Sequence, residues 1–122
     1  MALTLQDLKH EKVGACVSGG LDSRTIAKVL TENGVDVVAF TADLGQPDEV
    51  DITDIRKRMK PCGVDTILVD LKSEMGEACF EVIEAQAMYD GGYWNSTGIG
   101  RAVTVRGLIG AMRKQGCTVL SH

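Results

Sequence analysis

The residues best placed to do chemistry form a hexapeptide, Ser18-Gly19-Gly20-Leu21-Asp22-Ser23, directly after an apolar run. Adjacent glycines let the backbone adopt positive φ and approach a ligand closely. The hydroxyls of Ser18 and Ser23 can donate hydrogen bonds to phosphate oxygens. Asp22 would repel a phosphate, so its carboxylate is better suited to Mg²⁺, a hard cation that prefers oxygen. The stretch therefore predicts a site for a phosphorylated ligand and Mg²⁺.

Two segments must position this hexapeptide. Residues 13–17 form a short apolar run typical of a strand, and residues 22–34 carry apolar positions at helical spacing. In open α/β sheets ligands bind where a strand ends, and the N–H groups that open a helix favour anions. A tight turn with Asp22 or Ser23 as a helix cap is the alternative. The complete hexapeptide between strand and helix favours the phosphate site.

The remaining chain alternates between strand and helix patterns. Strands are predicted at 35–42, 64–70 and 117–121, helices at 48–63, 72–90 and 101–116, and a glycine-rich loop at 91–100. The strands are continuous apolar runs, which indicates an α/β fold: an open parallel sheet with helices on both faces. A short helix is possible in the first dozen residues.

Composition narrows the class of protein. The chain has 122 residues, enough for one domain, and a net charge of −4, which argues against a broad nucleic-acid surface. No apolar run reaches the roughly 20 residues of a membrane span, and the first residues lack the apolar core of a signal peptide, so we expect a cytoplasmic protein. No C-x-x-C pair occurs, which predicts reduced thiols packed as small apolar side chains at Cys16, Cys62, Cys79 and Cys117.

The phosphate loop belongs to neither of two common types, because the sequence has no G-x-x-x-x-G-K-[ST] and no G-x-G-x-x-G. It resembles the pyrophosphate-binding loop (PP-loop) of the N-type ATP pyrophosphatases, which have a Rossmann-like fold of the HUP type and cleave ATP to AMP and pyrophosphate. The resemblance implies that Asp22 and Ser18 are catalytic, with Asp22 also holding Mg²⁺. It implies an ATP site of Cys16, Val17, Ser18, Gly19, Gly20, Leu21, Asp22, Ser23 and Arg24. Arg24 departs from the family pattern and either contacts phosphate or faces solvent.

Two further stretches look like the argininosuccinate synthase branch of that superfamily. The first is FTADLGQPDE at 40–49, in which the resemblance places Ala42 at the adenine site. The alternative is a plain strand-to-loop transition with Pro47 as a turn residue.

The second stretch is GGYWNSTGIGRAVT at 91–104. It is similar to the citrulline-side loop of the same family, which implies that Tyr93, Thr97 and Arg101 bind substrate. A cation at a helix start is opposed by the helix dipole, so an anionic ligand would explain Arg101. Packing aromatics at Tyr93 and Trp94, and an ordinary surface arginine, are the alternatives.

The last residues raise a separate expectation. In the resembled family the fourth strand runs into a segment of the form G-x-T-x-x-G-N-D, whereas this sequence stops at Ser121-His122. We therefore expect residues 1–122 to be one incomplete nucleotide-binding domain without the synthetase domain. His122 is interpreted as a strand-end residue rather than a catalytic base, and His10 as a surface residue.

The resemblance implies ligation of citrulline to aspartate, with ATP and Mg²⁺ as cofactors and a homotetrameric parent that binds no nucleic acid or membrane. For this chain alone it implies ATP binding at most. The alternatives are another PP-loop enzyme of the tRNA-thiolating or amidotransferase type, a non-catalytic nucleotide-binding module, and a fragment that binds nothing. Thiolating enzymes usually carry catalytic cysteines and basic surfaces, which this sequence lacks.

Overall fold

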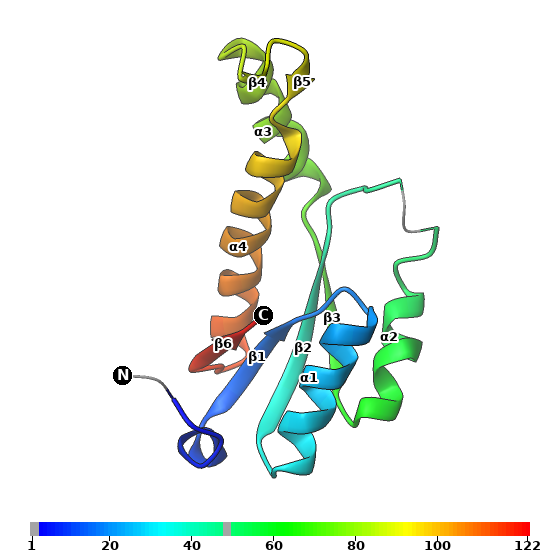
Figure 1. The fold of residues 1–122 in the computed structure, drawn as a ribbon, viewed down its shortest axis with the longest axis vertical. Coiled ribbons are helices and arrows are strands. Elements are labelled where there is room, and N and C mark those ends of the chain that lie inside the picture. Colours follow the sequence, from blue (N-terminus) through cyan, green and yellow to red (C-terminus); the bar gives the residue numbers. More distant parts are fainter. Residues whose placement is uncertain (1–2, 48–49) are drawn as a thin grey trace.

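The computed structural model describes residues 3–47 and 50–122 (Figure 1). Four parallel strands form the central sheet in the order β3-β2-β1-β6. These strands are β1 (Lys12–Cys16), β2 (Asp36–Asp43), β3 (Asp65–Asp70) and β6 (Val119–Ser121). The helices are α1 (Leu21–Glu32), α2 (Asp54–Met59), α3 (Lys72–Glu84) and α4 (Ser96–Lys114), with 3-10 turns η1 (Asp7–His10) and η2 (Lys60–Cys62). In the part of the chain that the structure describes, no helix is long and apolar enough to cross a membrane.

Helices cover both faces of the sheet, as predicted from the continuous apolar strands. Successive side chains of a strand point to opposite faces. Val37 and Ala39 of β2 therefore pack in the core beneath α1 and α2, whereas Phe40 packs with Leu108 and Met112 of α4. Figure 1 shows α1 and α2 on one side of the sheet and α4 on the other. Burial on both faces explains why the central strands β1 and β2 read as unbroken apolar runs, whereas the edge strands β3 and β6 are only partly buried.

Close packing of α4 depends on a glycine in β1. A Cβ at Gly14 would lie 2.8 Å from the Cγ and Sδ atoms of Met112. Real Cβ atoms do not approach other atoms so closely, so the bare strand backbone is what lets the Met112 side chain reach the sheet. Met112 is only 4 % exposed as a result.

The predicted helix at 72–90 is too long. Helix α3 ends at Glu84, and Gln86 then adopts a φ of +49° that reverses the chain. A short hairpin follows, made of β4 (Met88–Tyr89) and β5 (Tyr93–Trp94). Asp90 and Gly91 both have positive φ in its turn, the conformation that Asp-Gly favours. The predicted loop at 91–100 is accordingly replaced by β5 and the first turn of α4, which lie at the far end of the α3–α4 pair (Figure 1).

The predicted helix at 48–63 is also too long. Residues 48 and 49 lie outside the described part of the chain, and α2 begins only at Asp54. Asp51 accepts a hydrogen bond from the backbone N–H of Thr53 at 2.9 Å, which favours a turn before the helix. Val50 is fully exposed rather than on a buried helical face. The short helix expected in the first dozen residues is present as the 3-10 turn η1, and His10 is exposed as predicted.

Candidate functional site

A pocket of about 490 Å³ opens at the carboxyl edge of the sheet, between the start of α1 and the middle of α4. Six of the predicted nucleotide-site residues line it together: Cys16, Val17, Ser18, Asp22, Ser23 and Ala42. They come from the end of β1, the first turn of α1 and the end of β2. The volume is within the range of small-molecule sites, roughly 300 to 1,000 Å³.

In the loop from β1 to α1 only one of the paired glycines adopts the predicted positive φ, since Gly20 is extended with a φ of −74°. Gly19 is buried with a φ of +74°, and a Cβ there would meet the Ile55 side chain at 3.2 Å. Gly20 is the residue before the first turn of α1, and its N–H donates to the Ser18 Oγ at 3.4 Å. No side chain caps α1, so the N–H groups of its first turn remain oriented toward this end of the helix. Such N–H groups at the pocket rim form an arrangement that favours an anion.

The floor of the pocket is held by contacts between β1 and β2. The Val17 N–H donates to the Phe40 carbonyl at 2.9 Å, and the buried Thr41 hydroxyl donates to the Val17 carbonyl. Burial raises the pKa of the Cys16 thiol, so the cysteine on this floor is neutral near pH 7. All four cysteines are free thiols, as predicted, although only Cys62 is fully buried.

The loop after β2 supplies another wall, through a residue that sequence reasoning missed. Gln46 lines the pocket. Its side-chain oxygen accepts the Leu44 N–H at 2.9 Å, and its side-chain amide donates to the Ala42 carbonyl at 3.4 Å. The signal was present in the quoted segment at 40–49, where only Ala42 was singled out. Gln46 fixes the backbone beside Ala42.

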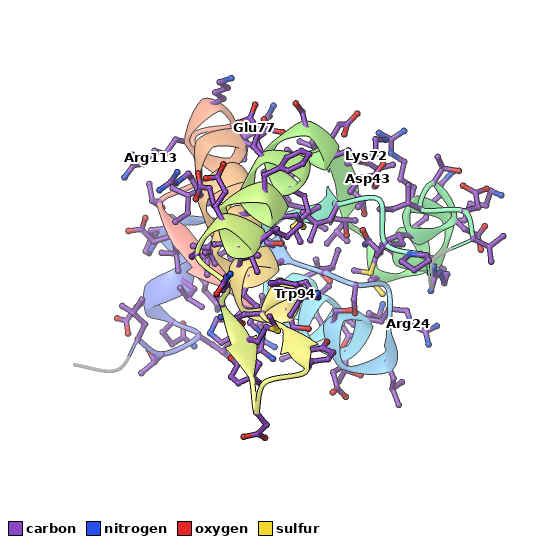
Figure 2. All side chains as sticks on the ribbon, turned by 90° about the horizontal axis from the view of Figure 1, so that it is seen from above. Arg24, Asp43, Lys72, Glu77, Trp94 and Arg113 are labelled. Atoms are coloured by element: carbon purple, nitrogen blue, oxygen red, sulfur yellow. The ribbon has the colours of Figure 1, made fainter. Side chains whose placement is uncertain are left out.

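An ion pair anchors that same loop to α3. The Lys72 Nζ lies 2.9 Å from the Asp43 Oδ2 and 3.4 Å from the Asp70 Oδ2 (Figure 2). Asp43 also accepts the Gly45 N–H at 3.0 Å. These hydrogen bonds hold the pKa of the Asp43 carboxyl below its usual range, and Asp43 raises the pKa of Lys72. Lys72 at the start of α3 thus ties the end of β2 to the end of β3.

Replacing Asp43 by Asn is expected to lower the melting temperature of the chain at pH 7. A carboxyl whose pKa is depressed by folding stabilises the native state above its unfolded pKa, about 3.9, and this contribution is lost as pH falls through the folded value. The two melting temperatures should therefore converge below about pH 4. Thermal melts of both proteins from pH 7 to pH 3 check this, and a constant difference across that range would contradict it.

Two loop residues that were predicted to bind ATP point elsewhere. Arg24 Nε donates to the Gly20 carbonyl at 3.4 Å, on the outer side of α1 (Figure 2). Leu21 is 71 % exposed, and both side chains line a separate shallow depression with Lys28. Of the two interpretations of Arg24, the structure therefore favours the one that turns its side chain away from the pocket.

The predicted substrate residues, Tyr93 of β5 and Thr97 and Arg101 of α4, lie beyond the pocket. Tyr93 and Thr97 are joined by a hydrogen bond of 3.1 Å between their hydroxyl oxygens. Arg101 is exposed, but it does not open the helix as predicted, because α4 begins at Ser96. None of the three lines the pocket. Thr97, Arg101 and Thr104 occur at positions i, i+4 and i+7 of α4, so they share one side of the helix. Because Thr104 lines the pocket, that side of α4 leads from the pocket toward Tyr93.

Sequence reasoning also missed three lining residues from the carboxyl-terminal half of the chain: Thr104, Leu108 and His122. Thr104 belongs to the quoted segment at 91–104, and its helical spacing from Thr97 was the available signal. His122 does follow a strand end, as predicted, yet it borders the pocket. That it is no catalytic base stays a prediction.

The pocket suits Mg²⁺ that arrives with a nucleotide. Within residues 3–47 and 50–122 no three His, Cys, Asp or Glu side chains gather to hold a metal by themselves. Nucleotide-bound Mg²⁺ needs only one or two carboxylates, with phosphate and water oxygens completing its coordination. Asp22, with the hydroxyls of Ser18 and Ser23 beside it in the pocket wall, provides that smaller set of oxygen donors.

Comparisons with a family model and with curated proteins point to the same family. The model of a family described as "Arginosuccinate synthase N-terminal HUP domain" matches residues 12–122. Argininosuccinate synthase 1 of Rhizobium johnstonii is 38% identical over 117 residues, which cover 93% of this chain and 28% of the relative. Argininosuccinate synthase of Pelobacter propionicus is 36% identical over 123 residues, covering 98% of this chain and 30% of the relative. The chain thus spans less than a third of the length of these relatives.

One solved structure supports the architecture independently. NMN synthetase from Francisella tularensis superposes with a TM-score of 0.52 over 70% of this chain and 38% of its own, at 14% sequence identity. At that identity the likeness shows the fold alone. Together with the family match, it confirms the predicted HUP-type α/β fold.

Proposed function

The chain belongs to the argininosuccinate synthase family, and from this we propose that it is the ATP-binding part of a ligase that joins citrulline to aspartate, releasing AMP and pyrophosphate. The observation that carries the proposal is the single pocket that unites the anion site at the start of α1 with Ala42 at the end of β2. An anion site and an apolar wall are what the two ends of ATP require.

In this proposal the phosphates of ATP lie at the first turn of α1. Ser18 donates to their oxygens, and Ser23 would do so by turning its hydroxyl from the Gly20 carbonyl, to which it donates at 3.2 Å. Asp22 would hold Mg²⁺, whose positive charge would stabilise the departing pyrophosphate. The adenine end lies toward Ala42. No side chain of the pocket acts as a nucleophile, so the contribution of these residues is positioning and charge stabilisation.

The side of α4 that carries Thr97 and Arg101 extends from the same pocket. This supports a citrulline site next to the nucleotide, at the end of α4 where Tyr93 contacts Thr97. In this proposal the ureido oxygen of citrulline attacks the α-phosphorus of ATP and pyrophosphate leaves, after which the amine of aspartate displaces AMP.

Thermal melts with and without Mg·ATP test the proposal. ATP at about 100 times its dissociation constant should stabilise the chain by about 2.7 kcal/mol, which raises the melting temperature by several degrees. Mg²⁺ with inorganic sulfate is the control for a general salt effect. A cooperative melt that Mg·ATP does not move would contradict ATP binding by this chain.

The chemistry itself is tested by pyrophosphate release in the presence of citrulline and aspartate. The 122 residues contain no G-x-T-x-x-G-N-D segment, so we expect the chain to bind Mg·ATP without releasing pyrophosphate. Mixing it with the remaining part of a family member should be needed for release. Release by the chain alone would show that its own residues suffice.

A further inference from the structure

Thr104 is the polar side chain that α4 contributes to the pocket. Thr104 and Leu108 lie one helical turn apart on α4, and both line the pocket. Other α4 residues, among them Val103 and Arg106, instead line the groove toward α3. The helix therefore turns a hydroxyl and an apolar side chain toward the site, and no residue of α3 separates them from it.

The Thr104 hydroxyl differs from the other helical threonines, because each of those has a partner. Thr25 donates to the Leu21 carbonyl at 2.9 Å, Thr31 to the Cys62 carbonyl at 2.9 Å, and Thr97 shares a hydrogen bond with Tyr93 at 3.1 Å. Across residues 3–47 and 50–122, Thr104 Oγ1 makes no hydrogen bond. It is half-buried, so water satisfies it only while the pocket is open to solvent.

A ligand that fills the pocket displaces that water and must replace its hydrogen bond, since an unpaired buried hydroxyl is costly. The pocket runs from the anion site at α1, on one face of the sheet, to α4 on the other. The charged end of a nucleotide belongs at α1, so its uncharged end reaches α4, where Phe40 and Leu108 provide an apolar surface.

We propose that Thr104 hydrogen-bonds the nucleoside part of the bound nucleotide and so determines affinity for it. This inference rests on the proposed ATP site and adds a contact from the opposite face of the sheet. A net hydrogen bond of ordinary strength corresponds to a change in affinity of about fivefold to tenfold.

The test compares Thr104→Val with Thr104→Ser by calorimetric titration of Mg·ATP. Valine keeps the branched shape and removes the hydroxyl, so affinity should fall about fivefold to tenfold. Serine keeps the hydroxyl and should restore affinity to within about twofold. Thr25→Val is the matched control, because its hydroxyl bonds within α1 and away from the pocket. Melts without ligand verify that each variant folds.

The outcomes separate the two proposals. If the unaltered chain does not bind Mg·ATP, the ATP site fails, and the inference fails with it. If it binds and Thr104→Val binds equally well, or Thr104→Ser is as impaired as Thr104→Val, only the role of the hydroxyl is overturned. Inorganic tripolyphosphate is a second probe: its affinity should not respond to Thr104→Val, and a matching loss would overturn the contact to the nucleoside part.

Discussion

Replacing Asp22 by Asn should lower the affinity of the chain for ATP at least tenfold when Mg²⁺ is present, and should leave it unchanged or slightly higher when Mg²⁺ is removed. Asp22 lines the pocket in the first turn of α1. With Mg²⁺ bound, its carboxylate attracts the metal that accompanies the phosphates. Without the metal the same carboxylate repels them, so its removal relieves a repulsion. The measurement is a titration of ATP into the unaltered chain and into Asp22→Asn, each once with Mg²⁺ and once with excess chelator.

The matched control for this change is Glu32→Gln. Glu32 ends the same helix, where it pairs with Lys28 at 3.4 Å, so the substitution alters net charge equally but far from the pocket. Asp22→Asn should itself cost only about 0.3 to 1 kcal/mol of stability, through a weaker interaction with the helix dipole. If the substitution weakened ATP binding equally with and without Mg²⁺, Asp22 would not be a ligand of the metal.

Replacing Gly19 by Ala should both destabilise the chain and impair nucleotide binding. Its φ of +74° costs an L-residue roughly 1 to 2 kcal/mol, and the added Cβ meets Ile55 at 3.2 Å and the Arg58 side chain at 3.4 Å. Relief of this crowding must shift the loop that carries Ser18. We expect an ATP affinity at least tenfold weaker, since misplacing a binding group by even about 1 Å is costly. Urea unfolding and calorimetric titration measure the two effects.

Gly34 offers the control for backbone strain. It has a φ of +76°, and a Cβ there would meet nothing within 4 Å. Gly34→Ala should therefore cost a similar amount of stability from the backbone alone and leave ATP affinity unchanged. If both variants bind ATP equally, the conformation of Gly19 does not position the site.

The pocket beside the loop from β1 to α1 was largely predictable because its signal is local. Ser18 to Ser23 are consecutive in sequence, and their position between a strand and a helix already determines where they lie on a parallel sheet. The same holds for Ala42 at the end of the next strand. The continuous apolar strands likewise predicted burial on both faces, which Phe40 and Val37 confirm.

The errors arose where long-range packing or one residue's conformation decides the outcome. Helical spacing continues past Glu84, but Gln86 adopts a left-handed conformation that no pattern of apolar residues encodes. The Asp90-Gly91 pair favours a hairpin turn, but the helix predicted at 72–90 included Asp90, so the hairpin was not predicted. Thr104 was missed because a residue in the middle of a helix reaches the pocket only through the angle at which α4 crosses the sheet, which depends on Gly14 admitting Met112.

The strand order has a consequence for how the site is assembled during folding. β1 pairs on one side with β2, its neighbour in sequence, and on the other side with β6, where Val13 is matched to Val119. Contacts of such wide sequence separation form slowly, because a long loop must close first. During synthesis the amino-terminal strands can associate well before β6 emerges from the ribosome. The loop between β1 and α1 can thus be in place early, whereas the pocket gains its α4 and His122 walls only when β6 has paired with β1.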